Sequence, residues 1–340
     1  MIKQFAQLTS VMLALFSGAI AIAQAPQQMA AADTASPAMW RVADADSEFI
    51  LLGTFHILPP ALEWRTDALD AAMKNADAVY FEVEADTPEA QSKTVSILMT
   101  QGFNPPGVTL SSMLSDADTQ KLKDITRSLN LPFSAVEPMR PWQAFLTLSV
   151  QFIVKQGFQP GAGVDSVLLA ESRTLGKELR FFETLEEQLN LFTTLDPDTE
   201  KNLLVLTLQD WENQQQMFDD LFAAWGRGDT AFIDEIMNET MREQTPKVYD
   251  SLIVRRNQAW AEEIANTMSD SAGTALVAVG AGHLVGDEHS VPALLRGKGF
   301  EVSRYGVDGE ASETNAANDN TPDDGADEIE DLLKQMETPE

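Results

Sequence analysis

The chain has 340 residues, and 44% of them are hydrophobic, which is enough for a packed core in one large domain or two modest ones. Its 53 acidic residues outnumber 23 basic ones and give a formal net charge of -30, which argues against nucleic acid or an anionic membrane surface as a partner. The sequence contains no cysteine, and this excludes disulfides, a thiol nucleophile, a cysteine-ligated zinc ion and a lipoprotein anchor.

The beginning of the chain has the pattern of a secretory signal peptide. Lys3 supplies a positive charge, and an apolar stretch from Leu8 ends in small residues suited to cleavage. An uncleaved membrane anchor is the alternative, but it needs about 18 to 20 unbroken apolar residues, and Ser17-Gly18 interrupts the stretch. We expect a signal peptide over residues 1–23, a flexible linker over residues 24–38, and a periplasmic or secreted protein without stable membrane insertion after cleavage.

The first predicted elements of the folded domain are two strands of a hairpin, Met39–Val42 and Phe49–Gly53, joined by a polar turn. The second strand is an apolar run that ends in Gly53-Thr54-Phe55-His56, a Gly-x-x-His motif. Such a run, bounded by glycine, is typical of a strand buried on both faces of a parallel sheet. Ligands bind outside the carboxyl ends of such strands, so His56 lies where this architecture places its chemistry.

A helix over Ala61–Asn75 is predicted next, followed by a strand over Ala78–Glu84 that ends in two acidic residues. Glu82 and Glu84 share one face, because side chains alternate along a strand. A carboxylate in an apolar buried strand is costly unless it is paired, hydrogen-bonded or bound to a metal ion. Glu82 is the stronger candidate because it lies deeper in the apolar run, and a salt bridge to an arginine is the structural alternative.

The middle of the chain is mostly helical in pattern, and we expect it to form a helical insertion. A long apolar helix extends to Lys155, and two further helical segments cover about residues 198–225 and 229–244. Gly163-Val164-Asp165 opens another helix, where Asp165 either caps the helix or orients a histidine.

Three more charged residues are candidates for the site. A strand over residues 178–184 ends near Glu183, and the following helix carries Glu187. Arg256 lies among apolar neighbours on a helix over residues 248–268. An arginine in a half-buried helix normally pairs with a carboxylate, and functionally it could hold a substrate carboxylate or a developing oxyanion.

A second apolar strand ends in Gly280-Ala281-Gly282-His283 and repeats the Gly-x-x-His motif. Two of the three histidines in the chain therefore follow a glycine at the same spacing at the end of a predicted strand. Capping of the strand, or a buried hydrogen bond, is the alternative interpretation for each. We predict that His56 and His283 converge on strands that are neighbours or separated by one strand.

These elements predict an α/β fold over residues 39–306, with a mixed, largely parallel central sheet flanked by helices. A closing helix near residues 290–298 and a strand near residues 300–305 complete the domain. Residues 307–340 are acidic and have few large apolar side chains, so they cannot bury enough surface to fold, and we expect a disordered tail.

The sequence resembles the TraB/GumN family, most closely its bacterial GumN-like branch. The matching segments follow one another in the expected order between about residues 40 and 305: Leu51–His56, Val79–Glu84, Gly163–Asp165, Phe182–Leu189, Arg256-Asn257 with Trp260, and Val279–Gly286. The resemblance implies a fold of the erythromycin-esterase/ChaN type and a shared site of His56, His283 and Glu82. In the remotely related Tiki metalloproteases, these positions support metal-dependent peptide hydrolysis.

Two histidines and a carboxylate are also a suitable ligand set for zinc, manganese or cobalt, independently of the family. Such a metal would activate a bound water and polarise a scissile carbonyl, with Glu84, Glu183 or Glu187 as general base and Arg256 facing the oxyanion. A metal-dependent, peptidase-like hydrolase acting on a peptide or small molecule is the function that we expect. The alternatives are a metal-free, esterase-like hydrolase with a histidine as base, and a periplasmic protein that binds a peptide or haem without turnover.

Overall fold

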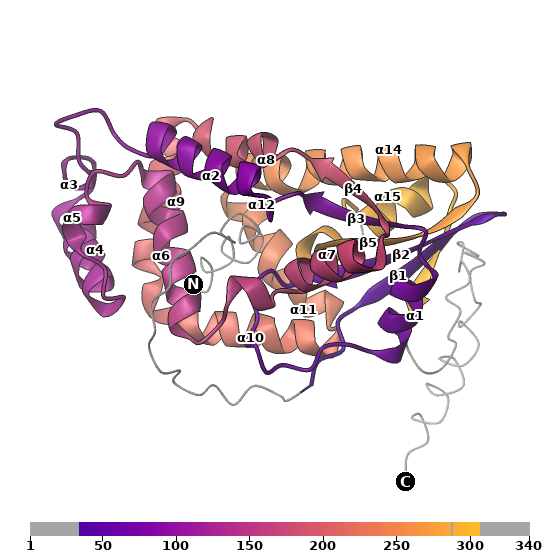
Figure 1. Cartoon of the computed structure of the whole chain (residues 1–340). Coiled ribbons are helices and arrows are strands. Elements are labelled where there is room, and N and C mark those ends of the chain that lie inside the picture. Colours follow the sequence, from indigo (N-terminus) through magenta and orange to yellow (C-terminus); the bar gives the residue numbers. More distant parts are fainter. Residues whose placement is uncertain (1–33, 287, 307–340) are drawn as a thin grey trace, which may run out of the picture. The chain divides into compact units, whose positions relative to one another are not determined.

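The computed structural model describes residues 34–286 and 288–306 (Figure 1). All of them belong to the first of the two units into which the chain divides, Met1–Gly306. The expected signal peptide, most of the linker and the acidic tail lie outside the described residues. Residues 34–38, which we assigned to the linker, pack on the domain: the main-chain amides of Ala35 and Ser36 donate to the carbonyls of Glu63 and Gly226, each at 2.7 Å.

Six strands form one sheet in the order β4-β3-β5-β2-β1-β6. Their bounds are β1 Met39–Ala43, β2 Ser47–Thr54, β3 Ala78–Val83, β4 Glu178–Glu183, β5 Gly273–Gly280 and β6 Glu301–Tyr305. β1 is antiparallel to both of its neighbours, and the other pairs are parallel. The predicted mixed, largely parallel sheet is therefore confirmed.

The two most apolar strands lie at the centre of the sheet. β5 pairs with β2 on one side and with β3 on the other, and six consecutive residues of each of β2 and β5 are buried. The predicted hairpin is also present, since Met39 pairs with Leu52 and the carboxylate of Asp44 accepts the amide of Ser47 at 2.8 Å. The burial of β2 and β5 shows that continuous apolar runs in the sequence identified the strands that are covered on both faces of the sheet.

Four helices connect the parallel strands: α1 Asp67–Asn75, α7 Val164–Leu175, α14 Arg255–Asp270 and α15 Val291–Gly297. α1 and α7 lie on one face of the sheet and α14 and α15 on the other (Figure 1), which is the arrangement that right-handed crossovers produce for this strand order. α1 begins six residues later than the predicted helix at Ala61. The hydroxyl of Thr66 accepts the amide of Leu69 at 3.1 Å and sets this start as an N-cap.

The remaining helices form two insertions. The first lies between β3 and α7 and contains α2 Pro88–Gln101, α3 Leu110–Met113, α4 Asp116–Ser128, α5 Phe133–Val136, α6 Pro141–Lys155 and the 3-10 turn η3 Pro160–Ala162. The second lies between β4 and α14 and contains α8 Leu185–Thr193, α9 Pro197–Gln209, η4 Trp211–Asn213, α10 Gln214–Arg227, α11 Thr230–Asp234, η5 Glu235–Glu239, α12 Thr240–Gln244, α13 Pro246–Tyr249 and η6 Asp250–Val254. η5 and η6 are π-helical turns, which occur often at functional sites and which the sequence pattern did not predict.

The carboxyl ends of β2, β3, β4 and β5 lie at one edge of the sheet. The segment after β3 crosses one face of the sheet and the segment after β5 crosses the other. These two connecting segments therefore diverge where the two neighbouring strands end. Open α/β sheets bind ligands at such a point. A separate finding is that no helix in residues 34–286 or 288–306 is long and apolar enough to cross a membrane.

Candidate active site

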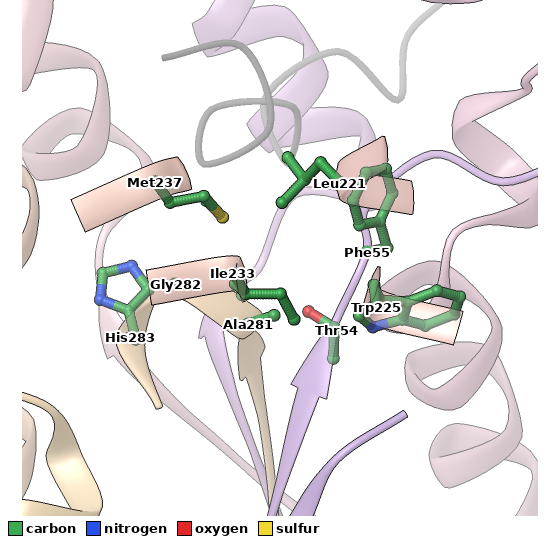
Figure 2. A pocket seen from close by; sticks show the side chains of 10 residues that line it. Thr54, Phe55, Leu221, Trp225, Ile233, Met237, Ala281, Gly282 and His283 are labelled. Carbon is green, nitrogen blue, oxygen red and sulfur yellow. The ribbon is translucent and has the colours of Figure 1, made fainter. Parts of the chain in front are cut away.

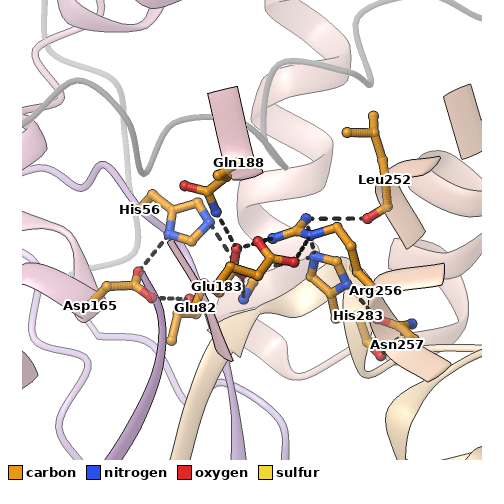
Figure 3. Close-up of polar contacts among 12 residues, drawn as sticks. His56, Glu82, Asp165, Glu183, Gln188, Leu252, Arg256, Asn257 and His283 are labelled. Carbon is orange, nitrogen blue, oxygen red and sulfur yellow. Dashed lines mark hydrogen bonds and ion pairs between the residues drawn. The ribbon is translucent and has the colours of Figure 1, made fainter. Parts of the chain in front are cut away.

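His56 follows the end of β2 and is held by the segment that opens α7 (Figure 3). Its Nδ1 lies 2.7 Å from Oδ2 of Asp165, and the other carboxylate oxygen of Asp165 accepts the hydroxyl of Thr54 at 2.9 Å. A Cβ on Gly163 would lie 1.9 Å from the carbonyl oxygen of His56, so only glycine allows this close approach. The Gly163-Val164-Asp165 motif is therefore a device that positions the first histidine.

Asp165 does not cap α7, which was one of its two predicted roles. Gly163 occupies the N-cap position, and this helix end has no side-chain cap hydrogen bond in the described structure. Because a carboxylate can only accept, Nδ1 of His56 carries a proton and donates it to Asp165. The second predicted role, orientation of a histidine, is the one that the structure shows.

Glu82 lies near the end of β3, is 2% exposed, and has both carboxylate oxygens paired. Oε1 accepts the main-chain amide of Gly280 at 2.8 Å, and Oε2 accepts Nε2 of Gln188 at 3.1 Å and Nη2 of Arg256 at 2.7 Å. The same Oε1 lies 4.0 Å from Nε2 of His56. Glu82 thus binds residues of β5, α8 and α14 and lies beside the first histidine.

Arg256 lies at the centre of a polar cluster, and each of its N–H groups has an acceptor. The other members of this cluster are His56, Glu82, Asp165, Glu183, Gln188, Asn257 and His283 (Figure 3). It donates twice to Glu183, at 2.6 and 3.0 Å, and once to Glu82. Its Nη1 donates to the carbonyl of Leu252 at 3.2 Å and to Nε2 of His283 at 3.1 Å. A guanidinium has five N–H groups, and all five donate to acceptors in the protein. In this arrangement Arg256 therefore cannot also donate to an oxyanion, which is the role predicted for it from the sequence.

His283 lies in a 3-10 turn directly after β5 and is held from both ring nitrogens. Since Arg256 can only donate, Nε2 of His283 accepts, and Nδ1 donates to Oδ1 of Asn257 at 2.6 Å. Asn257 also donates to the carbonyls of His283 and His289, at 3.2 and 2.8 Å. The ring of Trp260 lies 4.4 Å from the His283 ring. The second histidine is therefore a fixed, neutral imidazole.

The two histidines have opposite pKa shifts. Burial alone would lower the pKa of His56, but the carboxylates of Asp165 and Glu82 outweigh burial and raise it to about 9. Burial and the adjacent Arg256 lower the pKa of His283 to about 3. The pKa of Glu82 falls to about 2, because Arg256 and the neighbouring histidines outweigh the effect of burial. Burial raises the pKa of Glu183, although Arg256 opposes this shift.

The expected metal ligands converge, but the arrangement does not fit a metal ion held by all three. Nε2 of His283 lies 3.9 Å from Oε1 of Glu82, which is close to the corresponding distance of 4.0 Å for His56. However, the lone pair of His283 Nε2 accepts from Arg256, and the guanidinium also binds Glu82. Within the described ranges, no three His, Asp or Glu side chains are arranged to hold one ion.

Two of the predicted general bases lie outside the cluster. Glu84 follows the last residue of β3, and its carboxylate binds Arg173 at 2.7 Å at the surface. Glu187 forms a capping box with Thr184, accepting the amide and the hydroxyl of that residue at 2.8 Å each. Glu183 is in the cluster, but both of its oxygens are bound to Arg256.

Sequence reasoning missed the roles of Gln188 and Asn257. Gln188 follows Glu187 in α8 and is buried against Glu82. The spacing of Thr184 and Glu187 is a capping-box signature, which could have assigned Glu187 to the helix end and pointed to Gln188 as the inward residue. Asn257 appeared only as a neighbour of Arg256, and we see no local signal that would have paired it with His283.

One of three comparisons with known proteins gave a match. The family model of the TraB/PrgY/gumN family matches residues 38–304, a range that includes each residue of the cluster. Comparison of the chain with curated proteins and with solved structures gave no match. The chain therefore belongs to the TraB/PrgY/gumN family.

Proposed function

We propose that this protein is a hydrolase in which His56 activates a water molecule for attack on a carbonyl group. The state of the His56 ring carries this proposal. Nδ1 is held by Asp165, whereas Nε2 is buried and has no hydrogen-bond partner in the part of the chain that the structure describes. A buried polar atom without a partner costs free energy, so we expect a water molecule or a substrate to bind at Nε2.

Water is the nucleophile that this environment favours. The chain has no cysteine, and the hydroxyl of Thr54 is already bound to Asp165. Oε1 of Glu82 lies 4.0 Å from Nε2 of His56, a separation that one water molecule can bridge with two hydrogen bonds of normal length. In its neutral form His56 accepts a proton from this water during attack, and Asp165 stabilises the imidazolium that results.

The proposed water would bind beside Gly280, between Glu82 and His56. A Cβ added to Gly280 would lie 3.2 Å from Oε1 of Glu82 and 3.2 Å from Nε2 of His56. A side chain at position 280 would therefore occupy the position between the two groups. In the proposed reaction Glu82 orients the water, and the guanidinium of Arg256 keeps Glu82 ionised.

A metal-dependent form of the same hydrolysis is the second candidate. It is favoured by one observation, the approach of Nε2 of both His56 and His283 to the same oxygen of Glu82. Binding of one ion by all three residues would require Arg256 to release His283, so this candidate needs a rearrangement of the cluster.

Hydrolysis of 4-nitrophenyl esters and 4-nitroanilides tests the proposal, with protein purified without a metal column or polyhistidine tag. We expect kcat/KM to rise with pH, with a midpoint near the His56 pKa of about 9, because the neutral imidazole is the base. His56→Ala should lower kcat/KM about 100-fold or more, and the surface variant Glu84→Gln should not change it.

Chelation separates the two candidates. Activity that survives EDTA supports the metal-free reaction, and activity that EDTA removes and Mn²⁺, Co²⁺ or Zn²⁺ restores supports the second candidate. If His56→Ala hydrolyses these substrates as well as the parent protein does, both candidates are wrong.

A further inference from the structure

The side-chain amide of Gln188 is bonded on one side only. Gln188 is 5% exposed, and its Nε2 donates to Oε2 of Glu82 at 3.1 Å. Its Oε1 is buried and has no hydrogen-bond partner among the described residues. Because a carboxylate only accepts, exchange of the two amide atoms would place two acceptors face to face, so Glu82 fixes the orientation of the amide. Oε1 therefore points away from the Glu82 oxygen that Nε2 binds, and it needs a donor from elsewhere.

The neighbours of Gln188 in α8 hold it in this place. Glu187 belongs to the capping box that fixes the start of the helix. Leu189 is fully buried and packs with Val83 of β3 in a small apolar cluster. The main chain at Gln188 is therefore fixed from both sides, and Figure 3 shows its side chain beside the ring of His56.

The other donors of the polar cluster are already used within the described residues. The five N–H groups of Arg256 donate to other acceptors, and so does the hydroxyl of Thr54. Nε2 of His56 remains, carries a proton below the pKa of about 9, and has no partner either. It lies 4.0 Å from Oε1 of Glu82, the carboxylate that also binds Gln188. One small molecule between them could therefore satisfy both unpartnered atoms.

A cavity beside the polar cluster, at the ends of β2 and β5, is a poorer place for such a molecule (Figure 2). Its volume is about 10 Å³, which is room for about one water. The polar side-chain atoms of its wall have partners: the hydroxyl of Thr54, Nε1 of Trp225 and both ring nitrogens of His283. A buried water makes two to four hydrogen bonds, and the unpartnered atoms of His56 and Gln188 offer them.

From these contacts we infer that Gln188 holds the attacking water, its Oε1 accepting one of the two O–H groups of the water between His56 and Glu82. The inference rests on the proposed function, because it adds a third group to the same water. While His56 is protonated, the water accepts from Nε2 and donates to Glu82 and Gln188, which satisfies all three groups. When His56 is neutral, the water turns one O–H toward Nε2, and the other stays with Gln188 and Glu82.

This arrangement orients the water for attack. The water oxygen bonds to the carbonyl carbon of the substrate, and the electron pair of the C=O π bond moves to the carbonyl oxygen. One water proton passes to Nε2 of His56, and the other stays on the new hydroxyl group, where Gln188 accepts it. Because both O–H bonds have fixed directions, a lone pair of the water faces the incoming carbonyl. Gln188 is therefore a catalytic residue in addition to a partner of Glu82.

High-resolution crystal structures of the parent protein and of Gln188→Met test this inference, with the water itself as the probe. In the parent, one water should lie within about 3.2 Å of Oε1 of Gln188, Nε2 of His56 and Oε1 of Glu82. Methionine has a similar length but no amide, so this water should be absent or displaced in the variant. A parent structure without a water in reach of Oε1, or an undisturbed water in Gln188→Met, would overturn the inference. The parent structure decides the geometry even if the variant does not fold.

Kinetics on the 4-nitroanilides separate this role from a structural one. Gln188→Met should lower kcat about tenfold and leave KM within about twofold, because the lost hydrogen bond orients the water and does not bind the substrate. Gln216→Met makes the same chemical change at an exposed position of α10 and should alter neither constant.

The two proposals can fail separately. Full activity in folded Gln188→Met, or a raised KM with an unchanged kcat, refutes the inference and leaves the proposed hydrolysis in place. A water bound by the three groups in a protein without hydrolytic activity leaves Gln188 assigned to that water and refutes only the hydrolysis.

Discussion

Replacement of Arg256 by methionine tests whether the buried cluster is held together by charge. Arg256 is 6% exposed and donates to two carboxylates, those of Glu82 and Glu183. Methionine keeps most of the length and the apolar contacts of the side chain but removes the charge and every N–H donor. The variant therefore leaves the buried carboxylate of Glu82 and the largely buried carboxylate of Glu183 without their shared cation.

The expected loss in the free energy of unfolding is large. Removal of one partner from a buried ion pair costs about 3 to 5 kcal/mol, since the other charge stays buried and uncompensated. Arg256 serves two carboxylates, so we expect a loss near the upper end, about 5 kcal/mol. A domain is typically stable by about 5 to 15 kcal/mol, and Arg256→Met should therefore be marginally folded at neutral pH.

The loss should depend on pH in a defined direction. Without the guanidinium, burial raises the pKa of Glu82 and Glu183 in the folded state above the unfolded value of about 4.3. A group with a raised folded pKa is destabilising only above its unfolded pKa, and increasingly so as pH rises through the folded pKa. The difference between Arg256→Met and the parent protein should therefore be smaller at pH 4 than at pH 7.

Urea unfolding followed by circular dichroism measures this difference at both pH values. Adding Glu82→Gln and Glu183→Gln to Arg256→Met removes the uncompensated charges and should restore at least half of the loss. Arg173→Met is the control, because Arg173 binds Glu84 at the surface and such pairs contribute about 0 to 1 kcal/mol. A loss in Arg256→Met no larger than that of the control would refute the buried charge network.

Three further predictions concern the first histidine and its surroundings. The free energy of unfolding should fall by about 3 kcal/mol as pH rises from 6.5 to 9. The reason is that protonated His56 stabilises the folded protein fully only below its unfolded pKa, and this contribution is lost as pH rises through the folded pKa of about 9. Asp165→Asn should largely remove this dependence on pH, as measured by urea unfolding at several pH values. Gly280→Ala should abolish hydrolysis by filling the space between His56 and Glu82, with a stability cost of about 1 to 3 kcal/mol, and an active, folded variant would show that no water is needed there. Glu187→Ala should leave kcat/KM unchanged and lower thermal stability slightly, because the residue is part of a helix cap; a large drop in kcat/KM would return it to the site.

The fold could be predicted from the sequence largely because its central strands are buried on both faces. An uncharged apolar run is a local property, so β2 and β5 were recognisable without knowledge of their partners. The two π-helical turns were not, because η5 and η6 continue helical segments of ordinary composition and differ only in backbone hydrogen bonding.

The residues of the candidate site that lie at strand ends could be predicted from the sequence, whereas the hydrogen-bond partners of these residues could not. His56, Glu82 and His283 follow from their positions at the ends of strands. Glu84 shares a face with Glu82 by alternation and was the weaker of the two candidates; β3 ends at Val83, and the side chain of Glu84 binds a surface arginine. Four of the five hydrogen bonds of Arg256 join it to residues 27 to 174 positions away in the chain, and these pairings depend on the tertiary structure.

The central position of β5 has a consequence for the way this protein folds. β5 lies between β2 and β3, yet Gly280 is 198 positions from Glu82, its hydrogen-bond partner. Until β5 has been synthesised, β2 and β3 each present an open edge, and unpaired strand edges promote association between chains. Contacts across so long a loop also slow folding, because loop closure must precede the contacts that stabilise it. A nascent chain that ends before Gly273 can therefore form neither the sheet nor a complete pair of histidines, and it should depend on protection from aggregation until synthesis has passed this strand.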